Sequence, residues 1–289
     1  MYLKALARKG SAAYWSKHIV AEENWANAQQ SLDYFLWRNS QYPGYIKFMP
    51  VDQADNLTVL DFGCGPGNDL VGFHEFSQPK RLIGVDVSKN SLEIAKRRLQ
   101  MHECDYLELY QIDEKTNKIP LPNDSVDLIN SGGVLHHVSN IEGALKELRR
   151  VLKPTGKMQI MVYNYQSIWL HLYVAYQFRL VRRKYDNDSV EEAFRKTTDG
   201  PNCPISRCYK PDKFVNFVSS HGFSGEFLGS AMSLIELEHL SQRLQALRDI
   251  RLPAEHREFL SSIKFDDNGF PTVNGVVAGI DACYKFKKI

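Results

Sequence analysis

The chain has 289 residues, enough for one large domain or for a domain with insertions. Its composition is that of an ordinary globular protein, with 43% apolar and 24% charged residues and without repeats or low-complexity tracts. A formal net charge of +2 gives no reason to expect a nucleic acid or a membrane surface as the partner.

The five cysteines are scattered, and none of them forms a CxxC pair. This pattern favours reduced thiols in a cytoplasmic protein over disulfides or a zinc site. The N-terminal stretch has no apolar run long enough for a signal peptide. The apolar and aromatic segment at 168–181 has 14 residues, whereas a bilayer span needs about 20. We therefore expect a cytoplasmic chain without a membrane span, in which this segment is a buried or lid helix.

The predicted elements begin with helices over residues 1–50, which are rich in Trp and Tyr and break at Pro43-Gly44. From residue 57, short apolar runs alternate with amphipathic segments. This alternation predicts parallel βαβ units in a doubly wound sheet. The expected strands are 57–62, 81–87, 106–112, 126–132 and 157–164, and the expected helices are 90–99, capped by Ser88, and 140–153, ended by Pro154 and Gly156.

The alternation stops after residue 165. The rest of the chain is expected to contain the aromatic helix, a charged piece (182–197), the loop "TDGPNCPISRCY", a helix (210–223), a strand near Glu226–Leu228, two helices within 233–264, a turn "DDNG" (266–269) and a final strand (276–288). The predicted fold class is α/β, with a seven-stranded, mostly parallel sheet whose last two strands are antiparallel. We expect a helical N-terminal lid at 1–50 and a main domain at 51–289, with insertions at 165–209 and 231–275.

Glycines are concentrated in "VLDFGCGPGND" (59–69), where the first strand should turn into a helix. Gly63, Gly65 and Gly67 remove side chains there, so that a ligand can approach backbone N–H groups and the helix N-terminus. The dinucleotide fingerprint would need a glycine where Asn68 stands, and no Lys-Ser/Thr follows for a Walker loop. Taken alone, the turn also fits a plain tight connection.

Two acids at later strand ends strengthen the ligand-binding interpretation. Asp86 ends the second strand, where a carboxylate can accept hydrogen bonds from two ribose hydroxyls. Asp113 ends the third strand and is placed to accept from an exocyclic amine. Taken singly, each acid is also explained by solvation or capping of a strand end.

Five motifs then follow one another over residues 55–165: "VLDFGCGPGND", "IGVDVS", "QID", "DSVDLINSGGVLHHV" and "LRRVLKPTGK". With them the sequence resembles the class I S-adenosylmethionine-dependent methyltransferases, and within these the small-molecule branch. The resemblance implies S-adenosylmethionine as the cofactor, a Rossmann-like fold, and a methyltransferase domain over 51–289.

The resemblance also assigns roles to residues. The glycine turn (Gly63, Gly65 and Gly67) would hold the methionine part of the cofactor, with Asp61 near its ammonium group. Asp86 would bind the ribose, Asp113 the adenine, and Ser131 would be a further cofactor-binding residue. The loop from Asp113 to Ile119-Pro120 is longer than usual, so the way in which Glu114 and Lys115 meet the adenine stays open.

A hydroxyl acceptor needs a base that is neutral near pH 7, which suits histidine. "LHH" follows the fourth strand and supplies His136 and His137 at the rim where a substrate would lie. We expect His137 to be the base and His136 to orient the acceptor. In the alternative interpretation, one of the two rings only packs against the next helix.

The acceptor is narrowed by motifs that the chain lacks. The fourth strand ends in "NSGG" instead of the Asn/Asp-Pro-Pro-aromatic loop of nucleobase amino methylation, and it lacks both the Pro-Cys pair of cytosine methylation and the paired glutamates of arginine methylation. A small molecule or a glycan end remains as the acceptor, and we expect methylation of its oxygen. The layout of the chain, with "SLDYFLWRN", "TDGPNCPISR" and a late "AGIDACY", also resembles methyltransferases of bacterial surface-sugar and secondary-metabolite pathways. N- or C-methylation of a metabolite, and a non-catalytic cofactor-binding subunit that activates a partner, remain open.

Three further interpretations concern the surroundings of this site. The N-terminal helices either fold over the cofactor as a lid, with Trp37 and Arg38 near its carboxylate, or pack on the sheet edge. Arg207 either binds an anionic substrate or forms a surface ion pair. No metal is expected, because "DDNG" does not have the spacing of a calcium loop.

Overall fold

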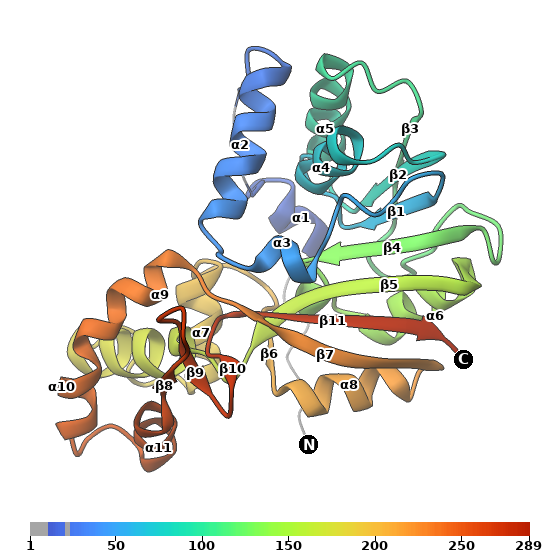
Figure 1. The fold of residues 1–289 in the computed structure, drawn as a ribbon. Helices are drawn as coiled ribbons and strands as arrows, with labels where there is room; N and C mark the ends of the chain where they lie inside the picture. The colour runs from blue at the N-terminus through green and yellow to red at the C-terminus, as the bar shows by residue number, and fades with distance from the viewer. Residues whose placement is uncertain (1–10, 21–23) are drawn as a thin grey trace.

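The computed structural model describes residues 11–20 and 24–289. A central sheet carries the architecture (Figure 1). Its strands are β1 (Thr58–Phe62), β2 (Arg81–Asp86), β3 (Leu107–Gln111), β4 (Val126–Gly132), β5 (Leu152–Asn164), β6 (Cys208–Tyr209), β7 (Phe223–Ala231) and β11 (Asp281–Lys288). Seven of them follow the order β3-β2-β1-β4-β5-β11-β7, and the two-residue β6 pairs with β5. Strands β1 to β5 are parallel, whereas β11 is antiparallel to both β5 and β7, which confirms the predicted fold class.

Helices cover both faces of this sheet because its strands are apolar on both sides. Val59 and Leu60 are neighbours in β1 and point to opposite faces, yet both are fully buried. Val59 packs in one apolar cluster with Phe35, and Leu60 packs in another with Phe214. The first cluster belongs to α2 (Ala28–Ser40), α4 (Asn68–Phe76) and α5 (Lys89–Met101), and the second to α6 (Ile141–Val151) and α8 (Pro211–Ser219).

Local chemistry sets the ends of these helices. The N–H of Ser91 donates to Ser88 Oγ at 3.2 Å, which confirms Ser88 as the cap of α5. The predicted break at Pro43-Gly44 is also present, because Gly44 has a φ of 86° and separates α2 from the short α3 (Tyr45–Phe48). One more short helix, α1 (Ser11–Trp15), precedes them.

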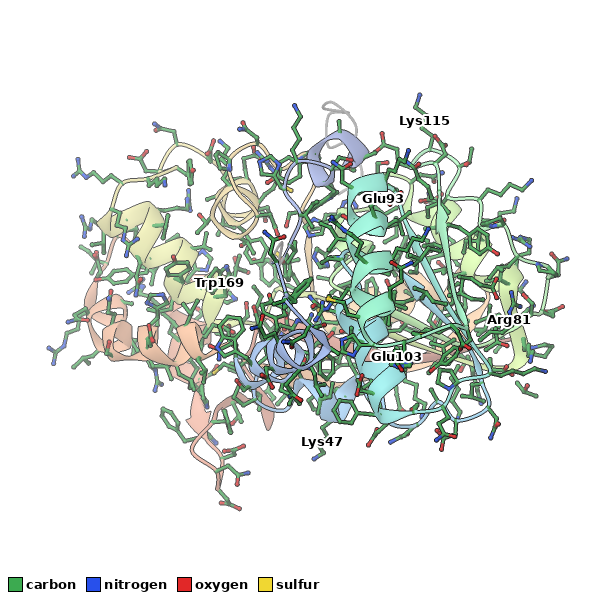
Figure 2. All side chains as sticks on the ribbon, turned by 90° about the horizontal axis from the view of Figure 1, so that it is seen from above. Lys47, Arg81, Glu93, Glu103, Lys115 and Trp169 are labelled. Carbon is green, nitrogen blue, oxygen red and sulfur yellow. The ribbon has the colours of Figure 1, made fainter. Side chains whose placement is uncertain are left out.

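The remaining elements form what we call the accessory lobe, which lies beside one end of the sheet (Figure 1). It comprises η2 (Trp169–Val181), α7 (Val190–Thr198), α9 (Leu234–His239), η3 (Leu240–Gln242), α10 (Arg243–Arg248), α11 (Ala254–Ser262), β8 (Lys264–Phe265), β9 (Pro271–Val273) and β10 (Val276–Val277). Figure 2 shows Trp169 in this lobe, at the opposite end of the molecule from Arg81. Both predicted insertions contribute to its apolar cluster, for example through Leu172 and Leu260.

The lobe differs from the sequence predictions in three ways. The aromatic segment is a π-helix, in which the N–H of Arg182 donates to the carbonyl of Gln177 at 2.9 Å. Three short helices and a 3₁₀ turn replace the two expected within 233–264. The last strand begins at Asp281 instead of residue 276, because Val276 and Val277 pair with β9 in a separate three-stranded sheet.

Candidate active site

A cleft of about 630 Å³ lies at the carboxyl edge of the sheet. We call one part of it the glycine-turn side (Asp61, Gly63, Gly65 and Asp86) and the other the β5–β11 side (His137, Tyr163, Asp199 and Asp281). The sheet order separates the two, because β1 and β2 lie before β4, whereas β5 and β11 lie after it. Residues of α1, α2, α3 and the accessory lobe also line the cleft, among them Trp15, Trp37, Tyr45 and Leu234.

The three predicted turn glycines have φ values of 77° at Gly63, 51° at Gly65 and 83° at Gly67, a region that other residues rarely adopt. A side-chain carbon built on Gly65 would meet nothing within 4 Å, whereas one on Gly63 would lie 2.5 Å from the methyl groups of Val134. Gly65 therefore leaves its backbone open to the cleft, and Gly63 permits close packing of the turn against the end of β4.

Asp86 is held by this turn. Its Oδ2 accepts a hydrogen bond from the N–H of Gly65 at 2.9 Å, and its Oδ1 accepts one from the N–H of Ser88 at 2.7 Å. Burial raises the pKa of Asp86, and the backbone hydrogen bonds oppose that shift. The carboxylate still lines the cleft, so it is oriented in advance for a ligand.

A polar network that sequence reasoning missed lies beside the glycine turn. The amide of Asn130 donates to Asp61 at 2.9 Å and to Asp69 at 3.0 Å, and Arg38 donates to Asp69 at 3.0 Å. Burial, and then the charge of Asp69, raise the pKa of Asp61 well above its usual range. The signals were present in the sequence, since Asp69 stands in "GND" and Asn130 in "NSGG".

Two other predicted cofactor residues lie elsewhere. Asp113 is exposed at the end of β3, where its Oδ1 accepts from the N–H groups of Lys115 and Thr116, and it does not line the cleft. Ser131 is buried behind the cleft and donates to the carbonyl of Phe62 at 3.3 Å. Glu114 does line the cleft and accepts from the N–H of Ala12 at 2.7 Å.

On the β5–β11 side, both predicted histidines lie in the 3₁₀ turn η1 (Leu135–His137), but only one of them faces the cleft. His137 lines the cleft, and its Nδ1 lies 2.7 Å from the carbonyl oxygen of Ile205. A carbonyl only accepts, so Nδ1 carries the proton and Nε2 of the neutral ring keeps a lone pair. Burial lowers the pKa of His137, and the charge of Asp199 partly offsets this. Nε2 lies 3.6 Å from Asp199 Oδ1, and this oxygen accepts a hydrogen bond from the Tyr163 hydroxyl at 2.9 Å.

His136 lies behind this wall. It is fully buried, it does not line the cleft, and neither of its ring nitrogens has a hydrogen-bond partner in the described part of the chain. Its ring centroid is 3.9 Å from that of Tyr163. Burial lowers its pKa well below 6.5, so the ring stays neutral.

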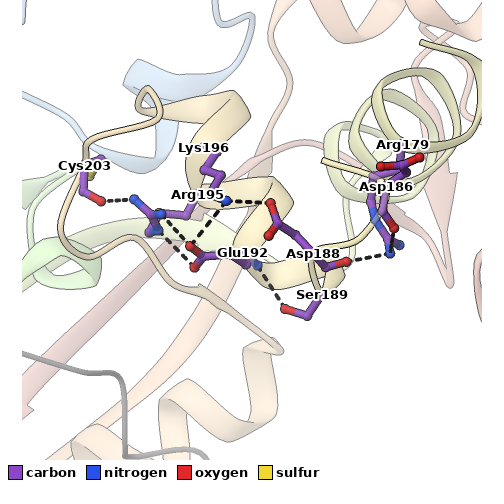
Figure 3. A network of polar contacts seen from close by, with 8 residues as sticks. All are labelled: Arg179, Asp186, Asp188, Ser189, Glu192, Arg195, Lys196 and Cys203. Atoms are coloured by element: carbon purple, nitrogen blue, oxygen red, sulfur yellow. Dashed lines mark hydrogen bonds and ion pairs between the residues drawn. The ribbon is translucent and has the colours of Figure 1, made fainter. Parts of the chain in front are cut away.

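The loop that carries Asp199 is fixed by charged contacts of α7 (Figure 3). Arg195 donates to the carbonyl of Cys203 and pairs with Glu192, and Lys196 pairs with Asp188 at 2.6 Å. Further along, Arg207 donates to the carbonyl of Val138 at 2.9 Å and does not line the cleft.

Within the described residues, His137, Asp199 and Cys203 could together reach one metal ion, since their ligand atoms lie within 4.8 Å of one another. The Cys203 thiol faces the carbonyl of Ile205 at 3.3 Å, and burial raises its pKa to about 12. This environment favours the thiol over the thiolate that a metal requires. We assign no metal to the cluster.

The sequence and the fold of this chain are both similar to those of known proteins. Residues 60–160 match the family described as "Methyltransferase domain". Residues 60–160 therefore form a methyltransferase domain of the class I S-adenosylmethionine-dependent type. Its relatives include an uncharacterised 37.1 kDa protein of a Streptomyces fradiae transposon, 32% identical over 52% of this chain and 41% of that protein. A demethylmenaquinone methyltransferase of Leptospira interrogans is 31% identical over 50% of this chain and 56% of its own length. The chain thus spans about half the length of the curated relatives it matches.

Solved structures agree with the methyltransferase fold. The YcgJ protein of Bacillus subtilis has a TM-score of 0.51 and 17% identity, covering 82% of this chain and 94% of that one. Geranyl diphosphate C-methyltransferase from Streptomyces coelicolor, solved with Mg²⁺, geranyl diphosphate and S-adenosylhomocysteine, has a TM-score of 0.53 and 12% identity, covering 96% and 97% of the two chains. At these identities the likeness concerns the fold alone.

The cleft fits S-adenosylmethionine, the cofactor of the methyltransferase domain. Gly65 leaves room for backbone approach, and the fixed carboxylate of Asp86 faces the cleft. The hydroxyl of Tyr45 is buried without a hydrogen-bond partner among the described residues, which marks a polar position left for a ligand. The acids Asp61 and Asp69 and the cation Arg38 match a ligand that carries both an ammonium and a carboxylate group.

Proposed function

We propose that this chain transfers the methyl group of S-adenosylmethionine to a hydroxyl oxygen of a small molecule or a glycan end, with His137 as the base. The orientation of that ring is the observation that carries the proposal. Its Nδ1 is committed to the Ile205 carbonyl, so the lone pair of Nε2 is available on the cleft wall.

The surroundings of His137 suit proton removal. Its lowered pKa keeps the ring neutral near pH 7, so that Nε2 can accept the hydroxyl proton. The charge that forms on the ring then lies 3.6 Å from Asp199, whose carboxylate stabilises an imidazolium. When bound, the cofactor supplies an electrophilic methyl group. The chain's own contribution is to hold the acceptor oxygen in place and to take its proton, and positioning alone can contribute about 7–11 kcal/mol.

The size and walls of the cleft support a small acceptor. Its volume of about 630 Å³ falls in the range of small-molecule sites. We propose residues 1–50 as the lid over it, and the described part of this segment supplies Trp15, Trp37 and Tyr42 to the cleft wall, while residues 1–10 and 21–23 lie outside the described residues. No helix in the described part of the chain is long and apolar enough to cross a bilayer.

Relatives support a small-molecule acceptor and leave open which atom is methylated, since one structural neighbour is named a C-methyltransferase. The name of the Leptospira relative, demethylmenaquinone methyltransferase, concerns a small molecule. A surface-sugar or secondary-metabolite role and a cytoplasmic location remain predictions. A structural neighbour described as a complex of the Haloferax volcanii Trm112 methyltransferase activator with a putative methyltransferase, at a TM-score of 0.53 and 16% identity, leaves a protein partner open for this chain.

His137→Ala is the test. We expect kcat on the best acceptor of a hydroxyl-compound screen to fall about 10²–10⁴-fold. S-Adenosylhomocysteine affinity, measured by calorimetry, should not change. The acidic limb of the kcat–pH profile should disappear, because a base that must be neutral fails once it is protonated. His221→Ala is the matched control, since this ring lies just after α8 and does not line the cleft.

Other outcomes would point to other functions. A His137→Ala variant with near-normal kcat and an intact acidic limb would mean that proton removal lies elsewhere or that positioning suffices. A product methylated on nitrogen or carbon would replace O-methylation by the metabolite alternatives. Tight cofactor binding without turnover on any acceptor would favour the activator subunit.

A further inference from the structure

Asp281 is a buried acid of the cleft that neither the methyltransferase motifs nor the proposed base mechanism uses. It is the first residue of β11 and pairs with Tyr163 of β5 on one side and with Ala231 of β7 on the other. Directly opposed residues of an antiparallel pair point to the same face of the sheet. Asp281 and Tyr163 therefore project together, and both line the cleft.

The carboxylate of Asp281 has no hydrogen-bond or ion-pair partner among the residues that the structure describes. The residue is 4% exposed, and no hydrogen bond or ion pair reaches its carboxylate from residues 11–20 and 24–289. Burial raises its pKa to about 7, and the charge of Arg38 only partly opposes this. Arg38 itself is bonded to Asp69 at 3.0 Å.

Glu236, a fully buried acid near the start of β11, shows by contrast what a partnered carboxylate looks like. It accepts hydrogen bonds from the N–H groups of Ser233, Trp169 and Ile280 and from the Ser233 hydroxyl. Because a buried carboxylate without donors is costly, it persists where a ligand supplies them. A ligand for Asp281 must therefore bring hydrogen-bond donors, and a positive charge would match best.

The walls around Asp281 suit a cation. Tyr163 pairs with Asp281 across the strands, and Tyr42 packs in the same apolar cluster as Tyr163 and Ile280. Both rings line the cleft, and aromatic faces attract ammonium groups. Among the described lining residues there is no lysine, and Arg38 is the one guanidinium, against six carboxylates: Asp61, Asp69, Asp86, Glu114, Asp199 and Asp281. This lining offers a cationic acceptor more partners than an anionic one.

We propose that Asp281 binds a positively charged amine of the methyl acceptor, whose hydroxyl group lies at His137. The inference rests on the proposed function and narrows its substrate class to amino alcohols, aminophenols or amino sugars. Tyr163 links the two positions, since it pairs with Asp281 across the strands and donates to Asp199 beside His137. An acceptor of this kind would lie along Tyr163, with its two polar ends at Asp281 and at His137.

The experiment compares matched compounds that differ in their amine. Tyramine with 4-ethylphenol, and glucosamine with glucose, are titrated into the full chain saturated with S-adenosylhomocysteine, and binding is followed by thermal shift. The amine of at least one pair should bind about 10–100-fold more tightly than its neutral partner, the range for a charge-assisted hydrogen bond. Asp281→Asn should remove this preference. Glu236→Gln is the matched control for loss of a buried acid, and it should keep the preference.

Several results would overturn the proposal: equal binding of the neutral compounds, an amine preference that survives in Asp281→Asn, or no binding by either amine. The readout involves no turnover, so it fails independently of the proposed function. Methyl transfer to nitrogen, or a dispensable His137, would refute O-methylation by a histidine base and leave the amine site in place.

Discussion

The two sides of the cleft differ in how their acids are satisfied. On the glycine-turn side, Asp86 accepts two backbone N–H groups and Asp61 accepts the amide of Asn130. On the β5–β11 side, Asp281 has no donor and Oδ2 of Asp199 has none either, within the described residues. A site that always binds the same cofactor can be fixed by its own backbone. A site for the acceptor keeps hydrogen-bonding capacity that only the acceptor fills.

Gly65→Val should have the largest effect, because it fills the open side of the turn. We expect cofactor affinity, measured by calorimetry with S-adenosylhomocysteine, to fall by more than about 100-fold, since the glycine lets the ligand approach the backbone. Gly269→Val is the matched control: Gly269 also has a positive φ, of 81°, and open space around it, but lies in the accessory lobe. Both variants carry a similar backbone strain of about 1–2 kcal/mol. Equal affinity in the two variants would remove the turn from the cofactor site.

Asp281→Asn should stabilise the ligand-free protein, which sharpens the contrast between the two sides. The pKa of Asp281 in the folded state, about 7, lies above that of an unfolded aspartate. The protonated side chain therefore adds to the free energy of unfolding at low pH, and this stability is lost as pH rises through 7. At pH 8 the substitution removes the cost of the buried charge, roughly 2–4 kcal/mol. Near pH 3.5 the two proteins should be equally stable.

The measurement is urea unfolding at both pH values. The tyrosines that face Asp281 stay neutral across this range, because burial raises the pKa values of Tyr42, Tyr45 and Tyr163 further above 10. Burial raises the pKa of Glu236 to about 8, so Glu236→Gln also removes part of a buried charge at pH 8. It replaces an oxygen that accepts hydrogen bonds from Ser233 and Ile280, however, and should therefore gain less stability than Asp281→Asn. A loss of stability in Asp281→Asn at pH 8 would show that the carboxylate has a structural partner after all.

The glycine-turn side could be predicted from the sequence because its signals are local. Strands β1, β2 and β4 are apolar runs bounded by turn residues, and they were placed within one residue. Asp86 and Gly65 are 21 positions apart, yet the same strand–turn–helix pattern predicts both. The role of Asp113 stays a prediction, since its carboxylate caps the turn after β3 and lies outside the cleft.

The β5–β11 side could not be predicted in the same way, because distant segments assemble it. Asp281 becomes a cleft residue only through its pairing with Tyr163, and the sequence shows no more than an acid at the start of an apolar strand. Asp199 reaches His137 through α7 and its salt bridges. Strands of two or three residues, such as β8 and β10, are too short to show periodicity. The sequence did predict His137 at the rim, because its position follows directly from the end of β4.

Asp86→Ala tests the glycine-turn side, and its effect should be smaller than that of Gly65→Val. The carboxylate would accept the ribose hydroxyls, and each charge-assisted hydrogen bond contributes about 1.5–3 kcal/mol. Cofactor affinity should therefore fall at least about tenfold in calorimetry. Asp86→Asn keeps the size of the side chain and one acceptor oxygen, so its loss should be smaller. Unchanged affinity in both variants would leave the turn without its proposed ribose ligand.

Arg207→Gln should have the smallest effect. It tests whether Arg207 binds the substrate, as one sequence interpretation holds, or acts on His137 only through its charge. Burial is the main cause of the lowered pKa of His137, and the positive charge of Arg207 lowers it further. Without that charge the imidazolium is less disfavoured, so the pKa of the base rises. The acidic limb of the kcat–pH profile should then move to higher pH. Glutamine can still donate to the Val138 carbonyl, so the maximal kcat and the cofactor affinity should stay the same. A raised KM for the acceptor with an unmoved limb would instead make Arg207 a substrate ligand and weaken the case for a cationic acceptor.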